Sequence, residues 1–136
     1  MEQSIYAMLA YEDPAAILDW LARAFGFVER MRHSEPDGTI SHAEMEYRGS
    51  VIMLATPTPD YQDPVRHRAD CAAAAKWSTV PYVINGLLVM VDDVDAHYRR
   101  AVGAGATILS EPEDGFPARR YRCEDPAGQR WMFMQG

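Results

Sequence analysis

The chain has 136 residues, of which 48% are hydrophobic, and a formal net charge of −7 at pH 7. This length and composition indicate one globular domain, or two half-domains around a common core, and exclude a disordered chain. The negative charge argues against nucleic acid and anionic membranes as partners, because both attract basic surfaces.

Three further features favour a cytoplasmic protein. The apolar runs, such as Leu87–Val91, are far shorter than the roughly 20 residues that span a bilayer. The first residues, Met1–Gln3, lack the basic and apolar regions of a signal peptide. Cys71 and Cys123 have neither zinc-like spacing nor a disulfide framework.

The first half begins with an apolar, β-rich stretch, Ile5–Tyr11, that predicts a buried strand. Asp13 and Pro14 follow as an N-cap and a first helical residue, and Gly26 is a typical helix end. The helix between them has an apolar stripe of Ile17, Leu18, Leu21 and Phe25.

Three more strands are expected after this helix. The turn residues of Glu35–Gly38 end the first of them, and Arg48-Gly49 joins the other two as a β-hairpin. The expected strands are Phe27–Ser34, Ile40–Tyr47 and Val51–Thr56.

The second half repeats this order. The apolar strand Ile84–Val91 leads into a helix capped by Asp92 or Asp93, 80 residues after Asp13. A strand at Thr107–Ser110 then precedes a hairpin around Asp125–Gly128, with expected strands Arg119–Glu124 and Gln129–Gln135. A tandem repeat predicts two half-sheets that bury their faces together.

Residues 57–82 interrupt the repeat. The stretch has four prolines and a short Ala-rich segment, Arg66–Lys76, that is expected to be helical. We interpret it as a linker or lid. The expected organisation is a first module at 1–56, a linker at 57–82 and a second module at 83–136, within one domain.

Three sequence segments resemble those of the glyoxalase/bleomycin-resistance/extradiol-dioxygenase (vicinal oxygen chelate) superfamily: Val91–Asp95, Gly103–Ala106 and Glu124–Gln129. The resemblance covers nearly the whole chain apart from the linker. It implies an α+β fold of two tandem β-α-β-β-β modules, whose curved sheets form a shared groove, and a bacterial-type homodimer. Members of this superfamily include metal-dependent lyases, isomerases and dioxygenases, and also metal-free proteins that sequester antibiotics.

The resemblance also indicates where metal ligands would lie in each half, one on the first strand and one on the last. In this chain these positions hold Tyr6 and Met53 in the first half, and Gly86 and Met132 in the second. A catalytic divalent metal takes imidazole and carboxylate ligands, which these four residues do not offer. We therefore expect no metal and no cofactor.

A displaced polar site remains open. If Arg48-Gly49 is a two-residue loop, Glu44 pairs with Met53, so His42, Glu44 and Glu46 face the cavity with it. One interpretation is an acid/base or metal patch. The other is a solvated strand face whose side chains pair with arginines.

The same argument around Asp125–Gly128 pairs Tyr121 with Met132 and Cys123 with Arg130. Arg119, Tyr121 and Cys123 would then face the cavity. Arg119 is either a clamp for a carboxylate or phosphate or a paired surface arginine. Cys123 is a nucleophile only with a depressed pKa, and otherwise a small apolar filler.

The predicted cavity wall is mostly aromatic and apolar, which suits a flat or hydrophobic small molecule. The favoured function is a metal-independent binding protein with a small-molecule ligand; the alternative is a lyase, isomerase or dioxygenase that uses His42, Glu44 and Glu46. The expected ligand-binding residues are Tyr6, Met8, Met53, Trp77, Tyr82, Met90, Phe116, Arg119, Tyr121 and Met132.

Overall fold

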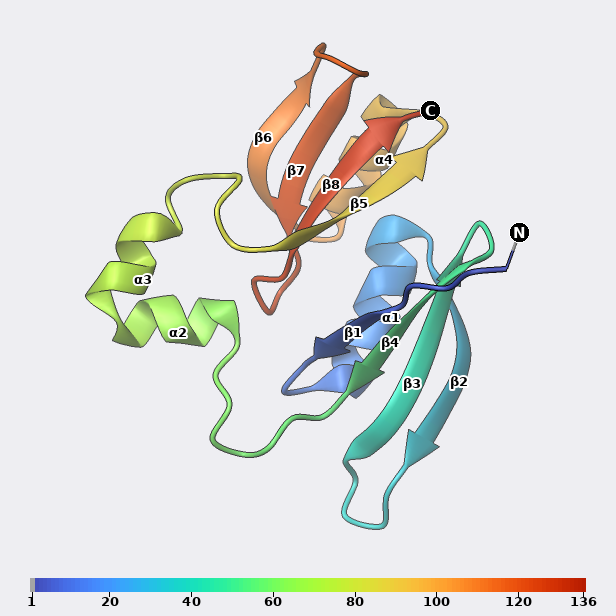
Figure 1. Ribbon diagram of the computed structural model, residues 1–136, viewed down its shortest axis with the longest axis vertical. Coiled ribbons are helices and arrows are strands. Elements are labelled where there is room, and N and C mark those ends of the chain that lie inside the picture. Colours follow the sequence, from blue (N-terminus) through green and yellow to red (C-terminus); the bar gives the residue numbers. More distant parts are fainter. Residues whose placement is uncertain (1) are drawn as a thin grey trace. The chain divides into compact units, whose positions relative to one another are not determined.

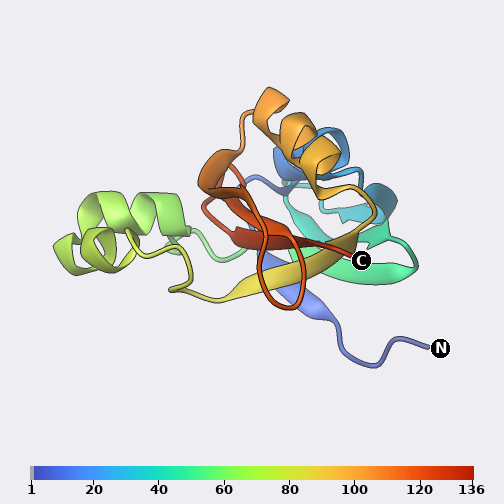
Figure 2. The same ribbon diagram turned by 90° about the horizontal axis from the view of Figure 1, so that it is seen from above.

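The computed structural model describes residues 2–136, which form two compact units, the first ending at Tyr61 and the second spanning Gln62–Gly136. Each unit has one four-stranded sheet and a helix packed on one of its faces (Figures 1 and 2). The α+β class and the tandem β-α-β-β-β order are therefore confirmed.

The first unit runs from strand β1 to strand β4. Its elements are β1 (Ala7–Ala10), α1 (Pro14–Phe25), β2 (Val28–Ser34), β3 (Ile40–Tyr47) and β4 (Ser50–Ala55). The sheet order is β1-β4-β3-β2, with β1 parallel to β4 and the other pairs antiparallel.

The second unit has the same topology after two short helices. Its elements are α2 (Pro64–Asp70), α3 (Ala72–Trp77), β5 (Gly86–Val91), α4 (Val94–Gly103), β6 (Thr107–Glu113), β7 (Arg120–Glu124) and β8 (Arg130–Gln135). The sheet order is β5-β8-β7-β6, with β5 parallel to β8.

Helix capping agrees with the sequence prediction. The Asp13 carboxylate accepts a hydrogen bond from the amide of Ala16 at 3.2 Å, and Asp93 does the same for Ala96 at 3.1 Å. Gly26 ends α1 at φ 79°, a left-handed conformation that glycine adopts without strain. The two modules thus begin their helices with the same cap.

The cores lie between each helix and its sheet. In the first unit, Leu21 of α1 and Met45 of β3 are fully buried. In the second unit, α4 lies against β6, β7 and β8 (Figure 2), and Phe133 is fully buried there. Several large apolar side chains stay exposed away from these cores, among them Ile5, Met8, Tyr82, Leu88 and Phe116.

Within the second unit, the segment around α2 contacts the loop between β7 and β8. The expected single helix Arg66–Lys76 is two helices, because Cys71 between them is extended. The amide of Val65 donates to the carbonyl of Ala127 at 3.2 Å. Gly128, at φ 90°, lies so close that an added Cβ would be 2.9 Å from Val65 N.

No helix in residues 2–136 combines the length and the apolar character that a bilayer crossing requires; the longest, α1, has 12 residues.

Candidate functional site

The register of the first hairpin is the predicted one. Arg48 and Gly49 form its two-residue turn with φ of 51° and 85°, the positive values of a type I′ turn. Glu44 pairs with Met53, as predicted. Ala43 and Met45 are fully buried on the α1 side, so His42, Glu44 and Glu46 lie on the opposite face of the sheet, partly exposed.

The polar side chains on this face bind one another. His42 Nε2 and Glu44 Oε2 are 2.8 Å apart, and Arg30 Nη1 of β2 is 3.9 Å from Glu44 Oε1. The contact between Arg30 and Glu44 agrees with the interpretation of a solvated strand face that pairs with arginines. The contact between His42 and Glu44 is one that an acid/base patch would require.

The register predicted for the second hairpin is wrong by one residue. Tyr121 pairs with Phe133, and Cys123 pairs with Trp131. A shift of one residue moves every side chain to the other face of the sheet. Tyr121 and Cys123 are therefore fully buried on the α4 side and do not face an open cavity.

Tyr121 is instead part of the aromatic core under α4. Its hydroxyl lies 2.6 Å from His97 Nδ1, and its ring stacks on Phe133 with centroids 5.2 Å apart. Burial raises the pKa of the Tyr121 hydroxyl and also that of the Cys123 thiol. Cys123 therefore has the properties of an apolar filler and lacks the lowered pKa of a nucleophile.

Arg119 is also held on the α4 side. Its guanidinium donates to both oxygens of Asp95 at 3.0 Å and to Asp114 at 3.2 Å. These hydrogen bonds, first to Asp95 and then to Asp114, raise the pKa of Arg119. The predicted cavity-facing orientation of Arg119 is thus wrong, because the same one-residue shift places it toward α4.

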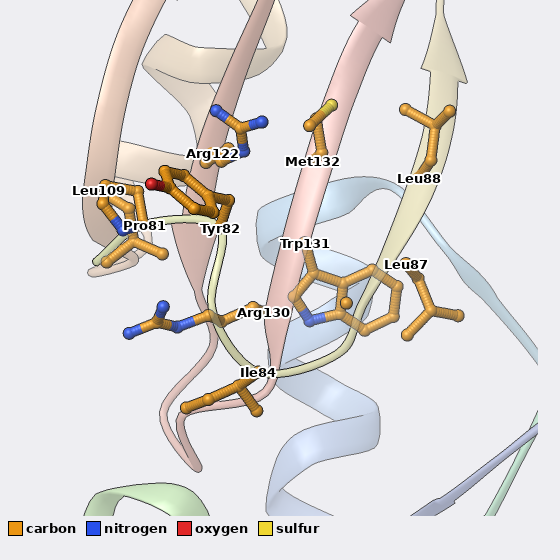
Figure 3. Close-up of a pocket in the computed structure, with 11 residues that line it drawn as sticks. Pro81, Tyr82, Ile84, Leu87, Leu88, Leu109, Arg122, Arg130, Trp131 and Met132 are labelled. Atoms are coloured by element: carbon orange, nitrogen blue, oxygen red, sulfur yellow. The ribbon is translucent and has the colours of Figure 1, made fainter. Parts of the chain in front are cut away.

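The shift brings other side chains of β7 to the open face, whereas those of β8 keep their predicted faces. A pocket of about 180 Å³ lies there, within the second unit (Figure 3). Of the predicted residues, Tyr82 and Met132 line it, whereas Met90 lies farther along β5. Its full lining is Pro81, Tyr82, Ile84, Gly86, Leu87, Leu88, Leu109, Arg122, Arg130, Trp131 and Met132.

Arg130 attaches the loop before β5 to this pocket. Its guanidinium donates to the carbonyls of Ser78 at 2.6 Å, Val80 at 2.6 Å and Val83 at 2.8 Å. It also donates to Glu124 at 3.0 Å. Glu124 in turn accepts two hydrogen bonds from Arg68 of α2, at 2.8 and 2.9 Å. The Arg68–Glu124–Arg130 cluster, in which Glu124 and Arg130 are buried, therefore holds one wall of the pocket.

The remaining predicted ligand-binding residues are dispersed. Trp77 ends α3, and Phe116 lies in the β6–β7 loop; neither lines the pocket. In the first unit, Met8 of β1 pairs with Met53, and Tyr6 precedes β1. Their contribution to ligand binding stays a prediction.

The last-strand positions that the resemblance indicates for metal ligands are Met53 and Met132, both within the described residues 2–136. Met53 lies between Met8 and Glu44 in the sheet register, and Met132 lies between Leu88 and Arg122. Within this described range, no three side chains of the His, Cys, Asp and Glu types lie close enough together to bind one metal.

The first unit has a more polar pocket of about 470 Å³. None of the predicted site residues lines it. Its wall contains the carboxylates of Glu12 and Asp37, and hydrogen bonds from Thr39 lower the pKa of Asp37. Its lining is Glu12, Asp37, Thr39, Ile40, Ser41, Thr56, Pro57, Thr58, Pro59 and Tyr61.

Comparison with known proteins agrees with this architecture. An uncharacterised protein of Mycobacterium bovis is 31% identical over 140 residues, covering 99% of this chain and 84% of the relative. The crystal structure of TioX from Micromonospora sp. ML1 is 32% identical, with a TM-score of 0.70 over 98% of this chain and 96% of TioX.

A glyoxalase/bleomycin resistance protein from Streptomyces sp. CB03234 has the same fold, with 19% identity and a TM-score of 0.66 over 96% of this chain and 97% of that one. The family model described as Glyoxalase/Bleomycin resistance protein/Dioxygenase superfamily matches residues 4–133. The chain therefore belongs to the glyoxalase/bleomycin resistance protein/dioxygenase superfamily.

Proposed function

We propose that this protein is a metal-independent binding protein for a hydrophobic or aromatic small molecule. The observation that supports this most directly is the pocket on the second sheet, whose wall presents Tyr82, Leu88 and Met132. Leu88 and Tyr82 are exposed, although apolar side chains of this size are usually buried. Apolar surface in a concave site with few polar groups is typical of small-molecule binding.

Metal independence is supported by the residues at the superfamily's ligand positions. Tyr6, Met53, Gly86 and Met132 offer neither an imidazole nor a carboxylate. Gly86 is also constrained by packing, because an added Cβ would lie 3.0 Å from the Arg130 carbonyl oxygen. A side chain at this position would require the backbone of Arg130 to shift by a few tenths of an ångström.

We further propose a cytoplasmic homodimer. Each unit leaves large apolar side chains exposed, including Ile5 and Met8 in the first and Phe116 in the second. A second copy that covers such side chains removes them from water, at about 25 cal/mol per Å² of apolar area.

The binding proposal is tested with protein that carries ¹³C-labelled methionine methyl groups. We expect 2-naphthamide, a neutral aromatic probe, to shift the Met132 resonance saturably. Leu88→Asp places a carboxylate in the pocket, so the dissociation constant should rise by about tenfold or more, because apolar rings do not solvate a charge. Sedimentation velocity of the same sample reports the oligomeric state.

The matched control is Val102→Asp, an exposed apolar position on α4. This variant should bind the probe like the unmodified protein. Absence of a saturable Met132 shift, or equal binding by Leu88→Asp, would refute the proposed pocket.

A second candidate function is an enzyme, favoured by the 2.8 Å contact between His42 and Glu44 on an open sheet face. A carboxylate that orients a histidine is a common acid/base arrangement. Metal analysis of the purified protein distinguishes the two functions. We expect less than about 0.1 equivalent of divalent metal per chain and unchanged naphthamide binding after chelation. One tightly bound equivalent that is lost from Glu44→Gln would favour the enzyme.

A further inference from the structure

We infer that Arg122 makes the pocket of the second unit selective for aromatic anions, and that the ligand is a flat aromatic compound with a carboxylate. This inference rests on the proposed function, because it concerns the same pocket. It adds the chemical class of the ligand and the residue that selects it.

The position of Arg122 follows from the observed register. In the sheet, Arg122 pairs with Met132 of β8 on one side and Ser110 of β6 on the other. Its side chain therefore lies on the open face, opposite to the buried Tyr121 and Cys123. Figure 3 shows it beside Met132, on the same wall as Tyr82 and Leu109.

The guanidinium groups of the neighbouring arginines already have hydrogen-bond partners within the protein. Arg119 is bound by Asp95 and Asp114, and Arg120 donates to the Phe116 carbonyl at 2.9 Å. Arg130 is bound by Glu124 and three carbonyls. In the described residues 2–136, no comparable hydrogen bond or ion pair engages the Arg122 guanidinium.

Local charge also favours an anion. The nearest carboxylate on this face of β7 is Glu124, which is already shared by Arg68 and Arg130. Glu124 therefore does not neutralise the charge of Arg122, which stays available to an anionic ligand.

The chemistry of the two parts of the pocket is complementary to one class of ligand. A guanidinium is weakly hydrated and presents parallel donors that match a carboxylate bidentately. Arg122 is half-buried, so less water competes with such a bond than at a fully exposed side chain. The rings of the same ligand would lie on Leu88, Leu109 and Met132.

Two isosteric probes test the inference. 2-Naphthoate carries a carboxylate, which is ionised at pH 7, and 2-naphthamide carries a neutral amide on the same rings. Titrations followed at the Met132 methyl resonance should give a dissociation constant about tenfold lower for naphthoate than for naphthamide. A hydrogen bond to a charged group stabilises a complex more than a neutral one does, by a free energy that corresponds to about this ratio.

The preference should depend on Arg122. In Arg122→Gln the ratio of the two dissociation constants should fall from about ten to about one, and Arg122→Lys should keep part of the preference, because it retains the charge without the bidentate geometry. The control, Arg99→Gln, changes an exposed arginine on α4 and should keep the full ratio.

The outcomes separate this inference from the proposed function. Equal affinity for both probes, or a tenfold ratio that survives in Arg122→Gln, overturns the role of Arg122 while the pocket stands. Failure of both probes to bind overturns the pocket and the inference together.

Discussion

Replacement of Glu124 by glutamine is expected to lower the free energy of unfolding by about 3 kcal/mol or more. The Glu124 side chain is only 1% exposed and accepts hydrogen bonds from Arg68 and Arg130. Glutamine keeps the shape but removes the charge that balances Arg130, whose side chain is 4% exposed. An uncompensated buried cation then destabilises the fold. Urea unfolding followed by circular dichroism measures the loss.

The control for this substitution is Asp19→Asn on α1. Asp19 also pairs with an arginine, Arg23, at 3.3 Å, but its side chain is 75% exposed. Exposed pairs of this kind contribute about 0.5 kcal/mol or less. A loss below about 1 kcal/mol for Glu124→Gln would show that the buried cluster tolerates an unpaired guanidinium, contrary to this account.

Trp131→Ala should destabilise the second unit by about 3–5 kcal/mol, the usual range for removal of a large buried aromatic side chain. The Trp131 ring is 1% exposed and stacks on Phe133 with centroids 6.4 Å apart. Its Nε1–H donates to the buried carboxylate of Asp125 at 3.1 Å. The substitution leaves a cavity under α4 and removes one donor from Asp125, and both effects lower the urea midpoint.

Trp77→Ala is the matched control, because it removes the same side chain from a position that is 41% exposed. Trp77 contacts the His67 ring with centroids 6.0 Å apart, so a loss of about 1 kcal/mol or less is expected. Equal losses for the two tryptophans would mean that the aromatic core under α4 contributes little to stability.

Much of the fold was predictable because helix caps, apolar strands and short turns in the sequence mark the same elements that the sheet topology contains. The caps Asp13 and Asp93 and the apolar strands before them mark the same unit twice. In the first hairpin, Arg48-Gly49 permits a single short turn, and the turn sets the register of every pair from Tyr47 to Ala43. The face occupied by His42, Glu44 and Glu46 follows from that register.

The second hairpin shows why the candidate site was only partly predictable. The amide of Asp125 donates to the carbonyl of Gln129, so the loop between these two residues has three members, ending with Gly128 at φ 90°. The sequence prediction assumed a loop with an even number of residues. An odd number of loop residues moves the side chains of β7 to the opposite face of the sheet. Arg122 therefore lies at the pocket, and Tyr121 and Cys123 lie on the buried face.

Other parts of the site depend on contacts that no local pattern records. Arg130 binds carbonyls of Ser78, Val80 and Val83, about 50 residues earlier in the chain. Periodicity places a side chain on a face of a strand, but it does not identify a backbone acceptor in a distant loop. For the same reason strand periodicity does not place Trp77 and Phe116, which lie outside the strands.

The attachment of α2 to the second hairpin decides where the polypeptide can be divided for separate study of its halves. A fragment that starts at Val83 would lack Arg68 and the carbonyls of Ser78 and Val80, and so would leave Arg130 and Glu124 short of partners. It would also expose the surface of Gly128 that approaches Val65. An autonomous C-terminal half therefore has to begin near Gln62, and the stretch from there to Tyr82 is part of its scaffold.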